Sequence, residues 1–166
     1  RIGETLLHDM ALRSLCLTAL RRHDIGTVRT LLPKSFVAVK AAGRLLGSHL
    51  AGTRAIACWL AWQDGHPDEV LRLAEDVESD DNIFGSGAMY RWVYLFPVLA
   101  VRLRVGELDH AVTAAAAIIH PSQQWLPDDL TAALAGAADA WRAGNETETT
   151  ERLTRALALA REHGYC

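Results

Sequence analysis

The sequence predicts an all-α fold, built as a short right-handed solenoid of about four antiparallel helical hairpins. Alanine and leucine supply 51 of the 166 residues, and half of all residues are hydrophobic, a composition that is typical of packed helices. Only 22% of the residues are charged, which excludes intrinsic disorder. A short turn sequence also recurs along the chain, and such recurrence indicates a helical repeat.

The recurring turns are centred on His23, Gly65, Gly106 and Gly144, which lie 42, 41 and 38 residues apart. Each turn follows an Ala-, Leu- and Trp-rich segment with helical periodicity and precedes another such segment. The repeated unit is therefore a helix, a tight turn and an antiparallel helix. Four such units fill the chain as a single domain, with hairpins predicted at roughly residues 4–46, 49–78, 86–119 and 128–163.

Residues beside the turns mark where helices end and begin. The glycines of the last three turns are expected in the left-handed conformation that follows a helix C-terminus. Asn145, with Glu148 three residues later, is typical of a helix N-terminus. Pro33 and Pro97 fall inside predicted helices, and each should end or kink its helix.

The first helix of each hairpin carries a row of small side chains and a row of large ones. Mostly small residues stand seven positions before the turns: Cys16, Cys58, Leu99 and Ala137. Large residues stand three positions before the turns: Leu20, Trp62, Leu103 and Trp141. This alternation lets the second helix approach closely, and it predicts that Cys16 and Cys58 pack in the core.

The turn Gly106-Glu107, followed by Ala111, resembles the turn of a tetratricopeptide repeat, in which alanine stands five residues after the glycine. Val28, Val70 and Thr149 stand at the position of Ala111 in the other turns. The period near forty residues exceeds the thirty-four of that family. The resemblance implies a divergent TPR-like superhelix whose first helices line a concave groove for an extended or helical peptide.

Four short segments carry a narrower resemblance: residues 90–92, 105–109, 126–130 and 155–161. They make residues 50–166 similar to the C-terminal repeat region of large bacterial, actinobacterial signalling ATPases. Such proteins often join this region to a LuxR-type DNA-binding domain or a nucleotide cyclase domain. The resemblance implies that the chain, which begins at Arg1, is a piece of a larger signal-transduction or transcription-regulatory protein.

The motifs for catalysis and metal binding are incomplete in the sequence. The chain has no GxxxxGK[ST] motif for ATP, no HExxH motif and no CxxC pair. Cys58 has no histidine close in sequence that would activate it as a nucleophile. We therefore predict a non-enzymatic chain with no cofactor and no metal, and the odd count of three cysteines favours the reducing cytoplasm.

Charge is unevenly distributed, although the net charge is only −3. Residues 1–54 carry nine Lys and Arg against three Asp and Glu, whereas residues 55–166 carry eight against seventeen. We expect these portions to meet neighbouring domains of the parent chain, or a second copy in a homo-oligomer. A nucleic-acid partner is not expected, because no helix-turn-helix or stacking motif is present. The charge-free stretch at residues 92–101 is too short for a transmembrane helix, so no membrane partner is expected.

The repeat geometry of the resembling family predicts which side chains face a partner. We call them the first-helix strip: Leu17, Leu20, Arg21, Trp59, Trp62, Gln63, Leu103, Arg104, Trp141 and Arg142. An apolar strip edged by arginines fits a protein or peptide segment that is apolar with acidic flanks. The alternative role for Trp62 and Trp141 is to fill the core between helices.

The sequence therefore predicts a protein-interaction and regulatory module of a bacterial signalling or transcription-control protein. The alternative is an effector-sensing domain that binds a small molecule in the concave groove near Trp59 and Trp62. A second candidate pocket for such a molecule is an aromatic cluster: Tyr90, Arg91, Trp92, Tyr94 and Phe96. One face of this cluster is expected to fill the core and the other to face a ligand.

Overall fold

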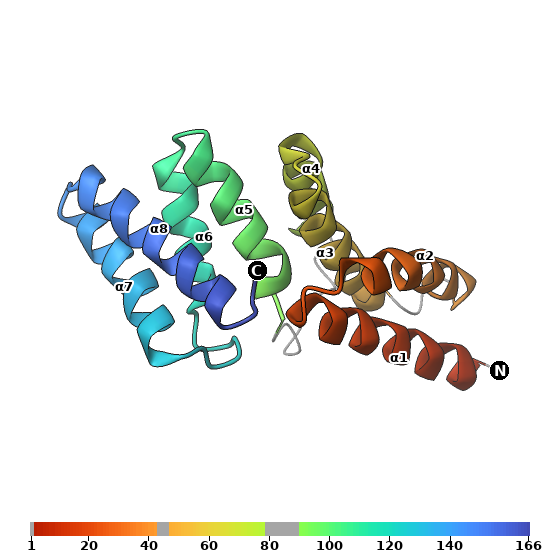
Figure 1. The fold of residues 1–166 in the computed structure, drawn as a ribbon. Coiled ribbons are helices and arrows are strands. Elements are labelled where there is room, and N and C mark those ends of the chain that lie inside the picture. The colour runs from red at the N-terminus through yellow and green to blue at the C-terminus, as the bar shows by residue number, and fades with distance from the viewer. Residues whose placement is uncertain (1, 43–46, 79–89) are drawn as a thin grey trace. The chain divides into compact units, whose positions relative to one another are not determined.

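The computed structural model describes residues 2–42, 47–78 and 90–166, and all regular structure within these ranges is α-helical (Figure 1). This confirms the predicted all-α class. The described helices are α1 (Ile2–Arg21), α2 (Ile25–Ala42), α3 (Gly47–Gln63), α4 (Pro67–Glu78), α5 (Trp92–Arg104), α6 (Leu108–Ile118), α7 (Asp128–Arg142) and α8 (Glu146–Glu162). None of these described helices combines the length and the apolar character that crossing a membrane requires.

The helices group into two compact units, which we call unit 1 (residues 1–87) and unit 2 (residues 88–166). The single domain that the sequence predicts stays a prediction. Each unit contains two helical hairpins. The predicted hairpin limits at residues 46 and 86 lie outside the described residues. The other predicted limits fall within two residues of the observed helix ends.

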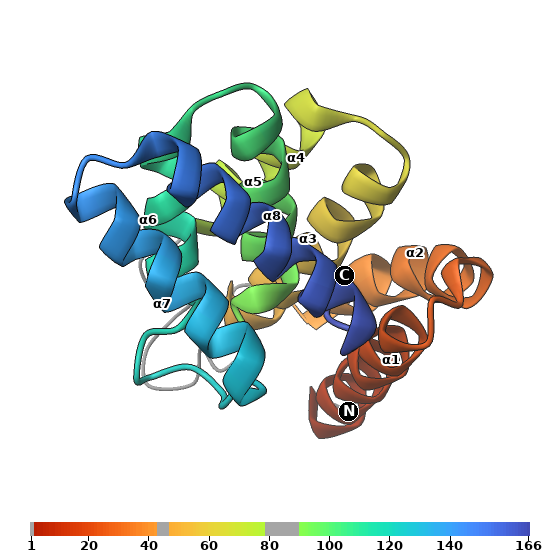
Figure 2. The ribbon, with the colours of Figure 1, turned by 60° about the vertical axis from the view of Figure 1, so that its left-hand side comes forward.

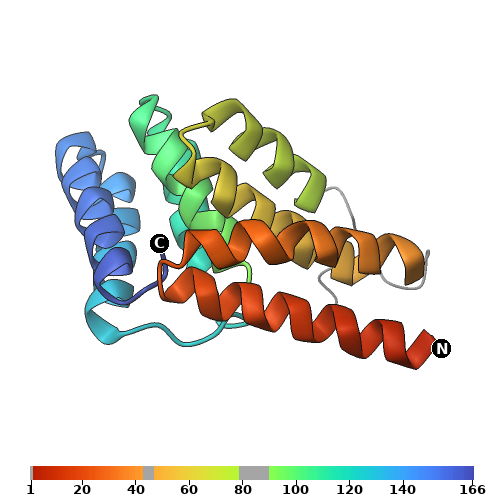
Figure 3. The ribbon, with the colours of Figure 1, turned by 45° about the vertical axis from the view of Figure 1, so that its right-hand side comes forward.

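In unit 1, α1 lies beside α2 and α3 lies beside α4 (Figure 3). The two hairpins meet chiefly through α2 and α3, with a smaller contact of α1 on α3. α3 therefore touches each of the other three helices. Its composition suits this central position, because most of its described side chains are small or apolar and buried: Ala51, Thr53, Ala55, Ile56, Cys58, Trp59 and Ala61.

In unit 2, α5 pairs with α6 and α7 pairs with α8 (Figure 2). α6 also contacts α7 and α8, and α5 contacts α8. Most of α5 is buried, from Trp92 through Pro97 and again at Leu99 and Val101. The ring of Tyr165, which follows α8, packs edge-on against Trp92 with ring centroids 5.0 Å apart. This contact fixes the residues after α8 to the start of α5.

The four turns inside the hairpins share one backbone geometry. The φ angle is 55° at His23, 75° at Gly65, 82° at Gly106 and 74° at Gly144. In each turn, this residue donates its N–H to the carbonyl three residues back, and the next residue donates to the carbonyl five residues back. These bonds define a Schellman motif. The left-handed conformation predicted for the three turn glycines is confirmed.

The hairpin cores are built from two equivalent rows. The residues seven positions before the turns are fully buried: Cys16, Cys58, Leu99 and Ala137. The residues five positions after the turns are also fully buried: Val28, Val70, Ala111 and Thr149. In the second hairpin the rows meet directly, because Sγ of Cys58 lies 3.4 Å from the carbonyl oxygen of Val70. The predicted core packing of Cys16 and Cys58 is confirmed.

Pro33 and Pro97 lie within α2 and α5, and both helices continue past them. Neither proline ends its helix, and the predicted alternative, a kink, stays a prediction. A proline inside a helix removes one backbone hydrogen bond but leaves the others in place. Packing against neighbouring helices compensates for that loss, and the buried position of Pro97 shows how closely α5 is packed.

Candidate binding groove

Unit 1 contains an open groove with a volume of about 850 Å³. α2 and α4 form its walls and α3 forms its floor, because both walls pack on α3 and, in the described ranges, do not contact each other. Most of its lining is apolar: Leu32, Phe36, Val39, Leu50, Ala57, Leu60, Ala61 and Leu73. A space of this size and character suits an apolar ligand or chain segment.

The two ends of the groove differ in charge. At the end beside the α3–α4 turn, Arg29 of α2 forms a two-point ion pair with Asp64. At the opposite end, Nη1 of Arg54 donates to the backbone carbonyl of Asp76 over 3.4 Å. Lys40 lines the same end from α2 and forms no ion pair with any residue that the structure describes. That end therefore presents two cations, and we call it the cationic end.

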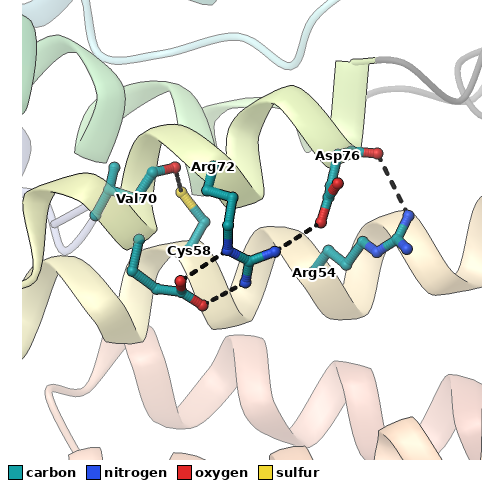
Figure 4. A network of polar contacts seen from close by, with 6 residues as sticks. Arg54, Cys58, Val70, Arg72 and Asp76 are labelled. Atoms are coloured by element: carbon teal, nitrogen blue, oxygen red, sulfur yellow. Dashed lines mark hydrogen bonds and ion pairs between the residues drawn. The ribbon is translucent and has the colours of Figure 1, made fainter.

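On the α4 wall, Arg72 forms ion pairs with two carboxylates of its own helix (Figure 4). Nε and Nη2 of Arg72 donate to the carboxylate of Glu69 over 2.9 and 2.5 Å, and Nη1 donates to Asp76 over 3.1 Å. The hydrogen bond from Arg72 lowers the pKa of the Glu69 carboxyl, which therefore stays ionised at neutral pH. Lys40 and Arg54 are therefore the two cationic side chains of the lining that have no carboxylate partner among the described residues.

The first-helix strip does not line this groove. In unit 1, Trp59 and Leu20 are buried, Leu17 and Trp62 are half-buried, and Arg21 and Gln63 are exposed. In unit 2, Leu103 and Trp141 are half-buried, and Arg104 and Arg142 are exposed. The strip follows the first helix of each hairpin, whereas the second helices form the walls of the groove. Partner binding by the strip stays a prediction.

The aromatic cluster near the start of α5 lies mostly inside unit 2. Trp92, Tyr94 and Phe96 are buried, whereas Tyr90 is exposed before the helix begins. Arg91 is half-buried, and its Nε donates to the phenolic oxygen of Tyr94 over 3.0 Å. One face of the cluster therefore fills the core, and a ligand role for its exposed part stays a prediction.

The three cysteines are free, buried thiols. Burial raises the pKa of Cys16 to about 11 and that of Cys58 to about 12. Burial also raises the pKa of Cys166 to about 12. The thiolate is the reactive form of cysteine, so at neutral pH these side chains pack as small apolar groups. Within the described residues, no cluster of His, Cys, Asp and Glu has the geometry to hold a metal ion.

A buried polar network in unit 1 was missed by sequence reasoning. Oγ of Ser35 donates to Oδ1 of Asp9 over 3.0 Å and lies 3.0 Å from Oγ1 of Thr53. Nε of Arg13 donates to Oδ2 of Asp9 over 3.1 Å. The absence of a side chain at Gly52 leaves room for this arginine, because a Cβ there would lie 2.6 Å from Nη1. The network joins α1, α2 and α3, and it positions the floor and one wall of the groove.

Sequence reasoning also missed the groove residues, although their spacing carries a signal. Leu32, Phe36 and Lys40 recur at four-residue intervals on α2. On α3, Leu50 and Arg54 are followed at helical spacing by further lining residues. Such a stripe identifies one face of a helix. It does not show that α2 and α4, the second helices of their hairpins, stand apart. This separation opens the groove.

The arrangement as a whole favours non-covalent binding. Most of its lining is apolar, the charged side chains of the α4 wall form ion pairs, and its cationic end offers Lys40 and Arg54 to an anionic group. The nearest thiol, Cys58, points its sulfur at a backbone carbonyl and stays protonated (Figure 4). Comparison with protein-family models, with curated proteins and with solved structures found no match to this chain, so the case for function depends on the groove.

Proposed function

We propose that the chain is a non-enzymatic interaction module whose groove in unit 1 binds an apolar segment of a protein partner. The groove itself is the observation that carries this proposal, since it combines a mostly apolar lining from three helices with one cationic end. Apolar burial supplies affinity, and the unpaired cations select a segment with an acidic flank.

The repeated hairpin turn supports a TPR-like architecture. All four turns use the same hydrogen bonds, and the same positions before and after each turn are buried. Stacked units of this kind build right-handed solenoids in the tetratricopeptide family that the sequence resembles. We propose this arrangement for the four hairpins.

The proposed setting is the cytoplasm of a bacterium, inside a signalling or transcription-regulatory protein. The resemblance to the repeat region of signalling ATPases supports this setting. The free state of all three cysteines is consistent with a reducing compartment. Repeat modules in such proteins join other domains or partner proteins, which agrees with a groove built for a chain segment.

A second candidate function is favoured by the size of the groove. Its volume of about 850 Å³ falls within the range of small-molecule sites. An amphipathic effector with an anionic group would place that group at the cationic end. Native mass spectrometry of the purified chain tests this candidate, because a stoichiometric additional mass would indicate a bound effector.

A phage-displayed peptide library selected on the purified chain tests the interaction role. We expect the recovered peptides to share apolar residues followed or preceded by acidic ones. Ala57→Arg places a long side chain on the floor of the groove and should abolish their binding. Ala11→Arg, at an exposed position of α1, is the matched control and should bind as the wild type does.

The decisive result is the comparison of these two variants. Circular dichroism should first show that Ala57→Arg retains the helical content of the wild type. If the folded Ala57→Arg variant still binds the selected peptides with wild-type affinity, the groove is not the binding site and the proposal fails.

A further inference from the structure

We propose that the groove of unit 1 receives the α6–α7 loop of a second copy of this chain, with Trp125 as the inserted side chain. The α6–α7 loop comprises residues 119–127, between the end of α6 and the start of α7. This inference rests on the proposed function, because it names the partner segment of the same groove.

Trp125 is 96% exposed, more than any other large hydrophobic side chain in the described part of the chain. A tryptophan buries a large apolar area when it finds a pocket, and this residue type is enriched at the energetic centres of protein interfaces. Leu126 and Pro127 extend the apolar surface beside it. The loop therefore presents the kind of anchor that an apolar groove accepts.

Hydrogen bonds hold the part of the loop just before Trp125, at residues 120–123. Gln123 is buried, its backbone N–H donates to the carbonyl of His120 over 2.8 Å, and its Oε1 accepts from the backbone N–H of Arg91 over 3.3 Å. The backbone N–H of Ser122 donates to Nδ1 of His120 over 3.2 Å. A fixed loop loses little conformational freedom on binding, which favours its use as a recognition element.

Charge complementarity links this loop to the groove. Asp128 lines the same shallow hollow as Trp125 and is exposed in the first turn of α7. Its neighbour Asp129 is engaged by His163 over 3.0 Å, whereas Asp128 has no hydrogen bond or ion pair among the described residues. The groove offers the complement, because Lys40 and Arg54 stand at its cationic end without a carboxylate partner in the described ranges. Each surface thus has an apolar part beside a charged side chain that has no oppositely charged partner among the described residues.

This pairing predicts a head-to-tail association. Each copy carries one groove in unit 1 and one α6–α7 loop in unit 2, so the loop of one copy and the groove of the next form a heterologous interface. Such interfaces either close into a ring or extend as a chain of copies. Variants in the two surfaces can therefore be combined by mixing.

Sedimentation velocity over a wide range of protein concentrations tests the proposal. We expect the weight-average mass of the wild type to rise with concentration, while Trp125→Ala stays monomeric. Lys40→Glu should weaken the association by about fivefold or more, the effect of one lost and reversed ion pair. Lys34→Glu, at an exposed position of the same helix outside the groove, should associate as the wild type does.

Mixing provides a sharper test than either variant alone. Trp125→Ala keeps an intact groove, and Ala57→Arg, which blocks the groove, keeps an intact loop, so their mixture should form a one-to-one complex that does not grow beyond two copies. In a single chain, Asp128→Lys combined with Lys40→Glu should restore part of the association that Lys40→Glu loses, because the ion pair at position 40 is reversed while Arg54 still stands at the same end.

The inference is overturned if the wild type is monomeric at every concentration, or if Trp125→Ala associates as the wild type does. Its failure can be told apart from failure of the proposed function. If Ala57→Arg loses the selected peptides while Trp125→Ala does not affect association, the groove binds other proteins and the second copy is excluded as its occupant. If the Ala57→Arg variant still binds the selected peptides, the proposed function itself fails.

Discussion

His23 is the one turn residue with a side chain at the left-handed position, whereas the other three hairpin turns use glycine. A residue with a Cβ loses about 1–2 kcal/mol in this conformation, and glycine adopts it without that cost. The first turn therefore stores strain that the other three avoid. The sequence alone places His23 in line with the glycines, because the recurrence of the turn aligns them.

His23→Gly is expected to raise the free energy of unfolding by about 0.5–1 kcal/mol, since relief of the strain exceeds the greater flexibility of glycine in the unfolded chain. Gly106→Val is the opposite change and should lower it by about 1 kcal/mol or more. Nothing lies within 4 Å of a Cβ at Gly106, so strain alone accounts for that loss. Urea unfolding followed by circular dichroism measures both. A Gly106→Val chain as stable as the wild type would contradict the turn geometry.

The hydroxyl of Ser35 completes the hydrogen bonds of buried Asp9. Ser35→Ala leaves that carboxylate with one donor fewer in the core, and we expect a loss of about 1–3 kcal/mol in the free energy of unfolding. Ser14→Ala, at an exposed position of α1, is the control and should change stability by less than about 0.5 kcal/mol. Equal urea midpoints for the two variants would show that the network contributes nothing to stability.

At the scale of elements, the hairpins could be predicted because their signals are local. The turn sequence, the helical period and the small residues before each turn all depend on neighbours in the chain. The prolines show the limit of this reasoning. Pro97 ends no helix because α5 is enclosed by other helices of unit 2. Packing against segments distant in the chain is not visible in the sequence around the proline.

The start of α2 gives a prediction about pH. Asp24 accepts hydrogen bonds from the hydroxyl of Thr27 over 2.6 Å and from its backbone N–H over 3.0 Å. These bonds, the hydroxyl first, lower the pKa of Asp24 below its ordinary value of 3.8. Its contribution to stability is therefore complete above that value and disappears as the pH falls through the lowered pKa.

We expect Asp24→Asn to reduce this loss of stability in acid, because asparagine keeps an oxygen acceptor at the helix start but cannot be protonated there. The measurement is the difference in urea midpoint between wild type and variant, at neutral pH and then at progressively lower pH. The difference should shrink as the solution becomes more acidic. A difference that does not depend on pH would show that Asp24 does not titrate with folding.

At the scale of the whole molecule, the composition was sufficient for the all-α class but not for the site. The first-helix strip was predicted from the geometry of a family, whereas the groove depends on how far α2 stands from α4. That distance is set by packing on α3, including the network at Asp9 and the space left at Gly52. Such a property belongs to three segments together, so no single stripe of residues reveals it.

The selected peptides can decide which surface of the molecule binds partners. If the groove is the site, Lys40→Glu should lower the affinity for an acidic peptide by about two- to fivefold, which is the contribution of a partly exposed ion pair. Arg104→Glu should leave both the fold and the affinity unchanged, because Arg104 is exposed on α5 and lies outside the groove. Isothermal titration of the same peptide into each variant measures both effects. The reverse outcome, with Arg104→Glu weakening the peptide and Lys40→Glu silent, would transfer the binding site to the first-helix strip, where arginines edge an apolar row.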